Sequence, residues 1–73
     1  MNYYELLGVE QDAAISDIEL MIDENYDKWR SLVTHHEASV VSEANQALSL
    51  LETMRGILLN PEKRKKYDQQ LEN

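Results

Sequence analysis

Two stretches of the chain carry apolar residues at intervals of three and four positions, the spacing of one face of an α-helix. The first stretch predicts a helix over about 16–33, with a stripe made of Ile18, Ile22, Tyr26, Trp29 and Val33. The second predicts a helix over about 40–58, with a stripe made of Val41, Ala44, Leu48, Leu51 and Leu58. Such stripes must be buried against other helices, so the expected fold class is all-α.

Shorter apolar segments flank this pair. A short helix is predicted over about 2–7, which contains two tyrosines and two leucines. Gly8 follows in the position of a helix C-terminal glycine. At the other end, Pro61 follows Asn60, which ends the second long helix because the residue before proline disfavours helical geometry. Pro61 also suits the first turn of a further helix, predicted over about 61–71.

Serine residues provide candidate helix starts. Ser16 and Glu19 have the spacing of a capping box, in which the hydroxyl and the carboxylate each accept from a free backbone amide. Ser39 or Ser42 is a candidate cap for the second long helix. Between the long helices the stripe breaks at residues 34–38, which contain no glycine or proline to mark a sharp boundary.

Both ends of the chain contain motifs that resemble those of one family. Residues 2–9 read NYYELLGV, residues 13–18 form a serine-capped helix start, and residues 60–68 read NPEKRKKYD. Their order and separation resemble the J-domain of DnaJ-type co-chaperones over essentially the whole chain. The resemblance implies a bundle of two long antiparallel helices with short helices packed on them, as a single J-like domain over 1–73.

The same resemblance implies docking on a DnaK-type chaperone and stimulation of its ATP hydrolysis. In the family this activity depends on a His-Pro-Asp tripeptide after the second helix and on a basic outer face of that helix. This sequence has Arg30, Ser31 and Leu32 near the expected tripeptide position, and its one proline is Pro61. The segment most similar to the His-Pro-Asp tripeptide is His35-His36-Glu37, which is displaced by about one helical turn and has no proline.

Charge is distributed unevenly along the chain, whose net charge is −7. Residues 1–27 contain eight acids and no lysine or arginine, while five of the seven basic residues lie at Arg55 and in 63–66. The outer face of the first long helix is therefore acidic where the family is basic, and it forms a candidate partner-binding face of Asp17, Glu19, Asp23, Glu24 and Asp27. An acidic surface that only keeps the protein in solution is the alternative interpretation.

Several side chains beside this face invite a functional interpretation. Tyr26, Trp29 and Arg30 are candidate partner anchors, although core packing is the simpler role for Trp29. Arg55 is expected to pair with an acid of the first long helix or to extend into solvent. His35 and His36 are expected to be exposed, without a metal ion between them.

Other classes of function find little support. The acidic charge opposes nucleic-acid binding, and the basic residues of 63–66 are expected to cover helix ends or acids of this chain. No apolar run is long enough for a membrane span, there is no secretory signal, and cysteine is absent, so we expect a cytoplasmic protein without metal or cofactor. No catalytic constellation stands out, and we expect no enzyme activity.

The sequence thus predicts a non-catalytic J-like protein-interaction module, an adaptor, assembly or regulatory subunit, that does not stimulate a DnaK-type chaperone. One alternative is a non-productive regulator that still binds the chaperone or a true J-protein. A second alternative is a small acidic regulator, of the kind a virus encodes, that binds a basic surface of a host protein.

Overall fold

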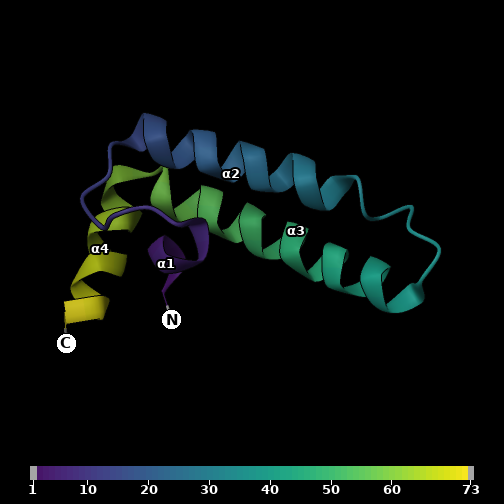
Figure 1. Cartoon of the computed structure of the whole chain (residues 1–73). Coiled ribbons are helices and arrows are strands. Elements are labelled where there is room, and N and C mark those ends of the chain that lie inside the picture. Colours follow the sequence, from purple (N-terminus) through teal and green to yellow (C-terminus); the bar gives the residue numbers. More distant parts are fainter. Residues whose placement is uncertain (1, 73) are drawn as a thin grey trace.

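The computed structural model describes residues 2–72 and contains four helices in the order expected. The long helices α2 (Ile15–Arg30) and α3 (Ala38–Leu58) run antiparallel, side by side, and the short helices α1 (Tyr3–Leu7) and α4 (Pro61–Glu72) pack near one end of the pair (Figure 1). The prediction of an all-α, J-domain-like bundle is confirmed. The ranges predicted for α1 and α4 are each correct to within one residue.

The core lies where the apolar faces of α1, α2 and α3 meet. The fully buried side chains of α2 and α3 recur at helical spacing, as the stripes predicted, and those of α1 close one side of the pair. The buried apolar residues are Tyr4, Leu7, Ile18, Ile22, Ala44, Leu51, Met54 and Leu58.

Both ends of α1 have the caps that a helix of five residues needs. The side chain of Asn2 accepts a hydrogen bond from the amide of Glu5 at 2.9 Å, which satisfies one of the free donors of the first turn. Gly8 takes a left-handed conformation with φ of 74°, and its amide returns to the carbonyls of the last turn. The predicted role of Gly8 is confirmed, because a residue with a side chain is strained at this φ.

The predicted capping box at the start of α2 is wrong. The helix begins at Ile15 with Ala14 as its N-cap, no side chain caps it, and Ser16 already lies within the first turn. Tertiary contacts explain the shift, because the guanidinium of Arg64 in α4 donates to the carbonyls of Gln11 and Ala13 at 2.9 and 2.7 Å. These bonds hold the chain immediately before Ile15 and fix where the helix can begin.

The predicted end of α2 near residue 33 is also wrong, since the helix ends at Arg30. The next residues turn through tighter bonds, with the amide of Leu32 donating to the carbonyl of Trp29 at 3.0 Å and the Ser31 hydroxyl donating to the carbonyl of Lys28. Helix α3 begins at Ala38, two residues earlier than predicted, and no serine caps it. Ser39 and Ser42 both lie within α3, and Glu37 occupies the N-cap position.

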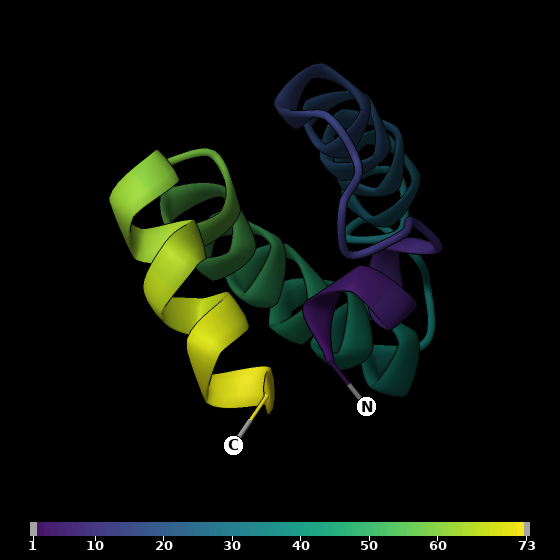
Figure 2. The same ribbon diagram turned by 90° about the vertical axis from the view of Figure 1, so that its left-hand side faces the viewer.

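Helix α4 joins the two ends of the chain. The ring of Tyr67 stacks on that of Tyr3 with centroids 4.7 Å apart, and its hydroxyl accepts from the Tyr3 amide. The hydroxyl of Tyr4 donates to Asp68 and accepts from Arg64 Nε at 3.2 Å. Figure 2 shows α1 and α4 together near the same end of the helix pair. The two motifs at the ends of the sequence thus meet in space.

Candidate functional site

The acidic residues predicted as a binding face are all exposed on α2. Successive residues of an α-helix are separated by about 100°, which spreads these acids over the side of α2 that points away from the core. We refer to them as the acidic face, which consists of Asp17, Glu19, Asp23, Glu24 and Asp27. The position of the face agrees with the prediction, while its binding role stays a prediction.

One residue of the acidic face is already occupied by a contact within the molecule. Arg55 of α3 donates from Nη2 to Asp23 Oδ1 at 2.6 Å, across the two long helices. The hydrogen bond to Asp23 raises the pKa of the Arg55 guanidinium above its ordinary value. This confirms the expected pairing of Arg55 with an acid of the first long helix. No other acid of α2 lies within ion-pair distance of a cation in residues 2–72.

One exposed apolar residue on the acidic face was not predicted from the sequence. Leu20 is 56% exposed and is the most exposed of the large apolar side chains in the described residues. It lies three positions from Asp17 and Asp23 and four from Glu24, so these acids are its neighbours on the helix surface. The signal was present, because Leu20 is an apolar residue outside the stripe of Ile18 and Ile22.

The three candidate anchors differ in exposure. Tyr26 and Trp29 are half-buried and pack against the core, whereas Arg30 is exposed and is the last residue of α2. The predicted core packing of Trp29 is therefore confirmed, although part of its indole reaches the surface. The ammonium group of Lys28 lies 5.6 Å from the centre of that ring.

The residues at the expected tripeptide position lie where α2 gives way to a turn. Arg30 ends the helix, Ser31 is its C-cap and is exposed, and Leu32 is half-buried. A proline in this turn would fix one backbone angle, and none is present.

His35 and His36 stack on each other in the connection between α2 and α3. Their ring centroids are 4.3 Å apart, and His35 Nδ1 accepts from the amide of Glu37 at 3.1 Å. Both residues lie outside a helix. His36 is exposed as predicted, whereas His35 is half-buried. Within residues 2–72, no three metal-ligating side chains are grouped.

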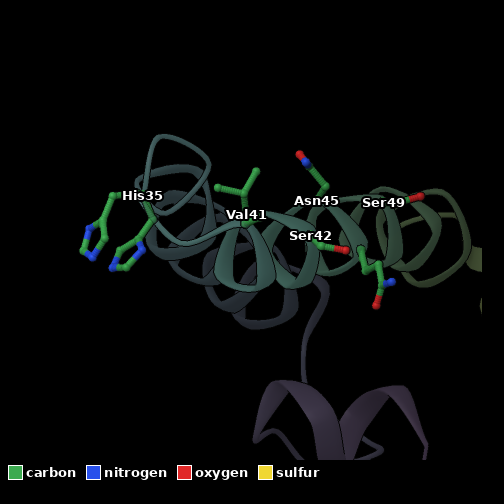
Figure 3. A pocket seen from close by; sticks show the side chains of 8 residues that line it. His35, Val41, Ser42, Asn45 and Ser49 are labelled. Atoms are coloured by element: carbon green, nitrogen blue, oxygen red, sulfur yellow. The ribbon is translucent and has the colours of Figure 1, made fainter.

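The two histidines border a hollow on the surface with a volume of about 700 Å³. Figure 3 shows the side chains that line it: Val41, Asn45 and Ser49 follow one another along α3, and His35 lies beyond the start of the helix. Six of its eight lining residues have polar side chains, and no group of side chains converges there. This hollow has neither the apolar enclosure nor the convergent polar groups of a typical ligand site.

The basic residues near the end of the chain divide into two groups. Arg64 is half-buried, and its guanidinium donates hydrogen bonds to Tyr4, Gln11 and Ala13 within the molecule. The neighbouring lysines, Lys63, Lys65 and Lys66, are exposed. In the part of the chain that the structure describes, no helix has the length and hydropathy of a membrane crossing.

Three curated proteins illustrate what this chain is similar to. DnaJ homolog subfamily B member 12 is 37% identical over 68 residues in Mus musculus and 35% identical over 68 residues in Homo sapiens, in each case over 93% of this chain. DnaJ homolog subfamily B member 14 of Bos taurus is 37% identical over 67 residues, or 92% of this chain. The chain spans only 16–17% of the length of these relatives. No protein-family model and no solved structure matches it.

Proposed function

The chain is a J-domain-like region, and we propose that it serves as a protein-interaction module that does not stimulate the ATPase of a DnaK-type chaperone. The observation that carries the proposal is the acidic face of α2, where four exposed acids have no ion pair within residues 2–72. In the family that the chain resembles, this helix presents basic residues to an acidic chaperone surface. Like charges that face each other across an interface cost several kcal/mol and slow the encounter.

The turn after α2 supports the same proposal independently. Ser31 and Leu32 stand near the position of the expected tripeptide, and the turn is held by local hydrogen bonds rather than by a proline. A chain that lacks only the tripeptide would keep the charge attraction for the chaperone. A chain that also lacks the basic face loses the attraction that brings the chaperone near. The partner we propose instead is a protein with a basic surface, which fits the acidic face in charge.

A stoichiometric ATPase assay tests the first half of the proposal. We expect a purified DnaK-type chaperone to keep its basal rate when this protein is added, while a true J-protein raises the rate in the same assay. A rise with this protein would contradict the proposal.

Charge neutralisation tests the second half. The variant D17N/E24Q/D27N removes three exposed acids of α2 and leaves the pair of Asp23 with Arg55 intact. The matched control E43Q/E62Q/E72Q removes three exposed acids of α3 and α4. We expect proteins retained from a native lysate by the wild type to be lost with the first variant and kept with the control. Equal retention by both variants would exclude the acidic face as the site.

A second candidate function follows from how completely the scaffold is kept. The matches cover 92–93% of this chain, and the scaffold itself is what a regulator needs to compete with a true J-protein. Titration of this protein into a mixture of chaperone and J-protein distinguishes the two candidates. Inhibition of the stimulated rate supports a non-productive regulator, whereas an unchanged rate leaves the first candidate.

A further inference from the structure

An apolar groove lies between α1, α2 and α3, on a different side of α2 from Arg55. It has a volume of about 330 Å³, and seven of its nine lining residues are apolar. The ring of Trp29 lines it together with Met54 of α3, while the amide nitrogen of Asn25 donates to the Met21 carbonyl of its own helix. A lining with so few free polar groups suits apolar side chains rather than a polar small molecule.

Two exposed leucines stand at this groove, one on α1 and one on α3. Leu6 is 46% exposed and Leu50 is 38% exposed, and both line the groove. Two large apolar side chains are thus left partly in water beside an apolar hollow with an aromatic ring in its wall. A partner that covers them removes apolar surface from water and gains an aromatic contact.

The charge at the groove is opposite to that of the molecule as a whole. Lys28 is the only charged residue among those that line it, in a chain of net charge −7. Its ammonium group lies beside Trp29, and no carboxylate of residues 2–72 is within ion-pair distance of it. Glu24 lies one helical turn before Lys28 and would repel a carboxylate of a partner. A partner's carboxylate is therefore favoured only at the Lys28 end of the groove.

We propose that this groove binds an amphipathic helix of another protein that inserts two apolar side chains and places a carboxylate on Lys28. A helix is the fitting form because the walls are helices, whose surface grooves accept the side-chain ridges of a further helix, and the described residues offer no sheet edge. The partner helix is expected to carry a carboxylate because Lys28 attracts an acidic side chain and repels a basic one. This interface is separate from the acidic face and does not depend on its role.

The single tryptophan of the chain supplies the measurement, because Trp29 lines the groove. Two synthetic helical peptides serve as probes; both have leucines four residues apart, and they differ in having glutamate or lysine one turn further on. We expect the glutamate peptide to shift the emission of Trp29 to shorter wavelengths and to bind at least about fivefold more tightly than the lysine peptide.

Three variants of the protein locate the interaction. Leu50→Gln is expected to weaken binding of the glutamate peptide about tenfold, and Lys28→Glu to reverse the preference between the peptides. Leu20→Gln is the matched control, because Leu20 is an exposed leucine of α2 that does not line the groove. Circular dichroism confirms that each variant folds. Equal affinity for both peptides, no saturable change of Trp29, or an equal loss with Leu20→Gln would overturn the proposal.

A second copy of this chain is the remaining candidate to occupy the groove. Sedimentation equilibrium is expected to give a monomer for the wild type and for Leu50→Gln. A wild-type dimer that Leu50→Gln dissociates would assign the groove to a second copy of the chain and overturn the proposal.

Discussion

The two ends of the helix pair are held together in different ways. At one end, hydrogen bonds join residues more than 50 positions apart, from Tyr3 and Tyr4 to Tyr67 and Asp68 and from Arg64 to Gln11 and Ala13. At the other end, every hydrogen bond of 31–37 in the described structure joins residues no more than four positions apart.

This difference explains how a J-domain-like scaffold persists with an altered turn after α2. Contacts between distant residues order several segments at once, so the loss of one contact weakens the others. Local turn contacts involve only their own segment. We therefore expect the end that contains Arg30, Ser31 and Leu32 to tolerate substitution better than the end that contains Tyr4 and Arg64.

The largest expected effect comes from Tyr4→Ala. Tyr4 is 2% exposed and lies in the core, so the truncation leaves a cavity and costs about 3–5 kcal/mol of unfolding free energy. A domain of this size has a net stability of roughly that amount, so we expect loss of most of the helical circular dichroism without denaturant. Val33→Ala, at the other end, is the control and is expected to stay folded. Equal denaturation midpoints for the two variants would contradict the comparison.

Arg64→Ala is expected to have the next largest effect. It removes three hydrogen bonds from a half-buried side chain and leaves two carbonyls before α2 without their partner, at a cost of about 1–3 kcal/mol in urea denaturation. Amide exchange at Ile18, whose amide donates to Ala14, should become faster. The exposed Lys65 in the same helix is the control, and Lys65→Ala should change stability by less than about 0.5 kcal/mol. The same loss in both variants would indicate a helix effect instead.

Tyr4→Phe separates the hydroxyl of Tyr4 from its ring. Loss of the bonds to Asp68 and Arg64 should cost about 1 kcal/mol near neutral pH. Burial first, and then the hydrogen bond to Asp68, raise the pKa of the Tyr4 hydroxyl above its ordinary value of about 10.

A raised pKa in the folded state gives a definite direction of pH dependence. The contribution of Tyr4 is fully present below about pH 10 and is lost as the pH rises through the higher pKa of the folded state. Denaturation midpoints measured from about pH 8 to about pH 11 should therefore fall less steeply for Tyr4→Phe than for the wild type. Parallel curves would refute this assignment.

Ser31→Ala is expected to have the smallest effect. The Ser31 hydroxyl donates to the Lys28 carbonyl, but the site is exposed and water replaces the bond. Thermal denaturation should show a change of less than about 0.5 kcal/mol. A loss as large as that of Arg64→Ala would mean that the turn after α2 contributes to global stability, contrary to the comparison.

The apolar stripes predicted the two long helices and most of their buried residues, while Gly8 and Pro61 indicated the two short helices. The boundaries of α2 were not predictable in the same way. Ser16 has the residue type of a cap, but Arg64, which lies 48 positions further along the chain, holds the carbonyl of Ala13 and lets the helix begin at Ile15. Local patterns contain no information about such a contact.

The candidate surfaces show the same division. The acidic face was predictable because helical spacing and residue type decide which side chains are exposed. The groove was not predictable, because its lining residues Leu6, Trp29 and Leu50 come from three different helices. Only the packing of these helices leaves both leucines partly exposed to water.

Residue type and spacing by themselves determined that this chain forms two amphipathic helices with a J-domain-like start and finish and an acidic outer face. The tertiary structure decided where those helices begin and end, which acid Arg55 neutralises, and where apolar surface remains uncovered. The physical reason is that periodicity acts over one or two turns of a single helix, whereas hydrogen bonds from Arg64 and the gap between three helices depend on residues that are distant in the sequence.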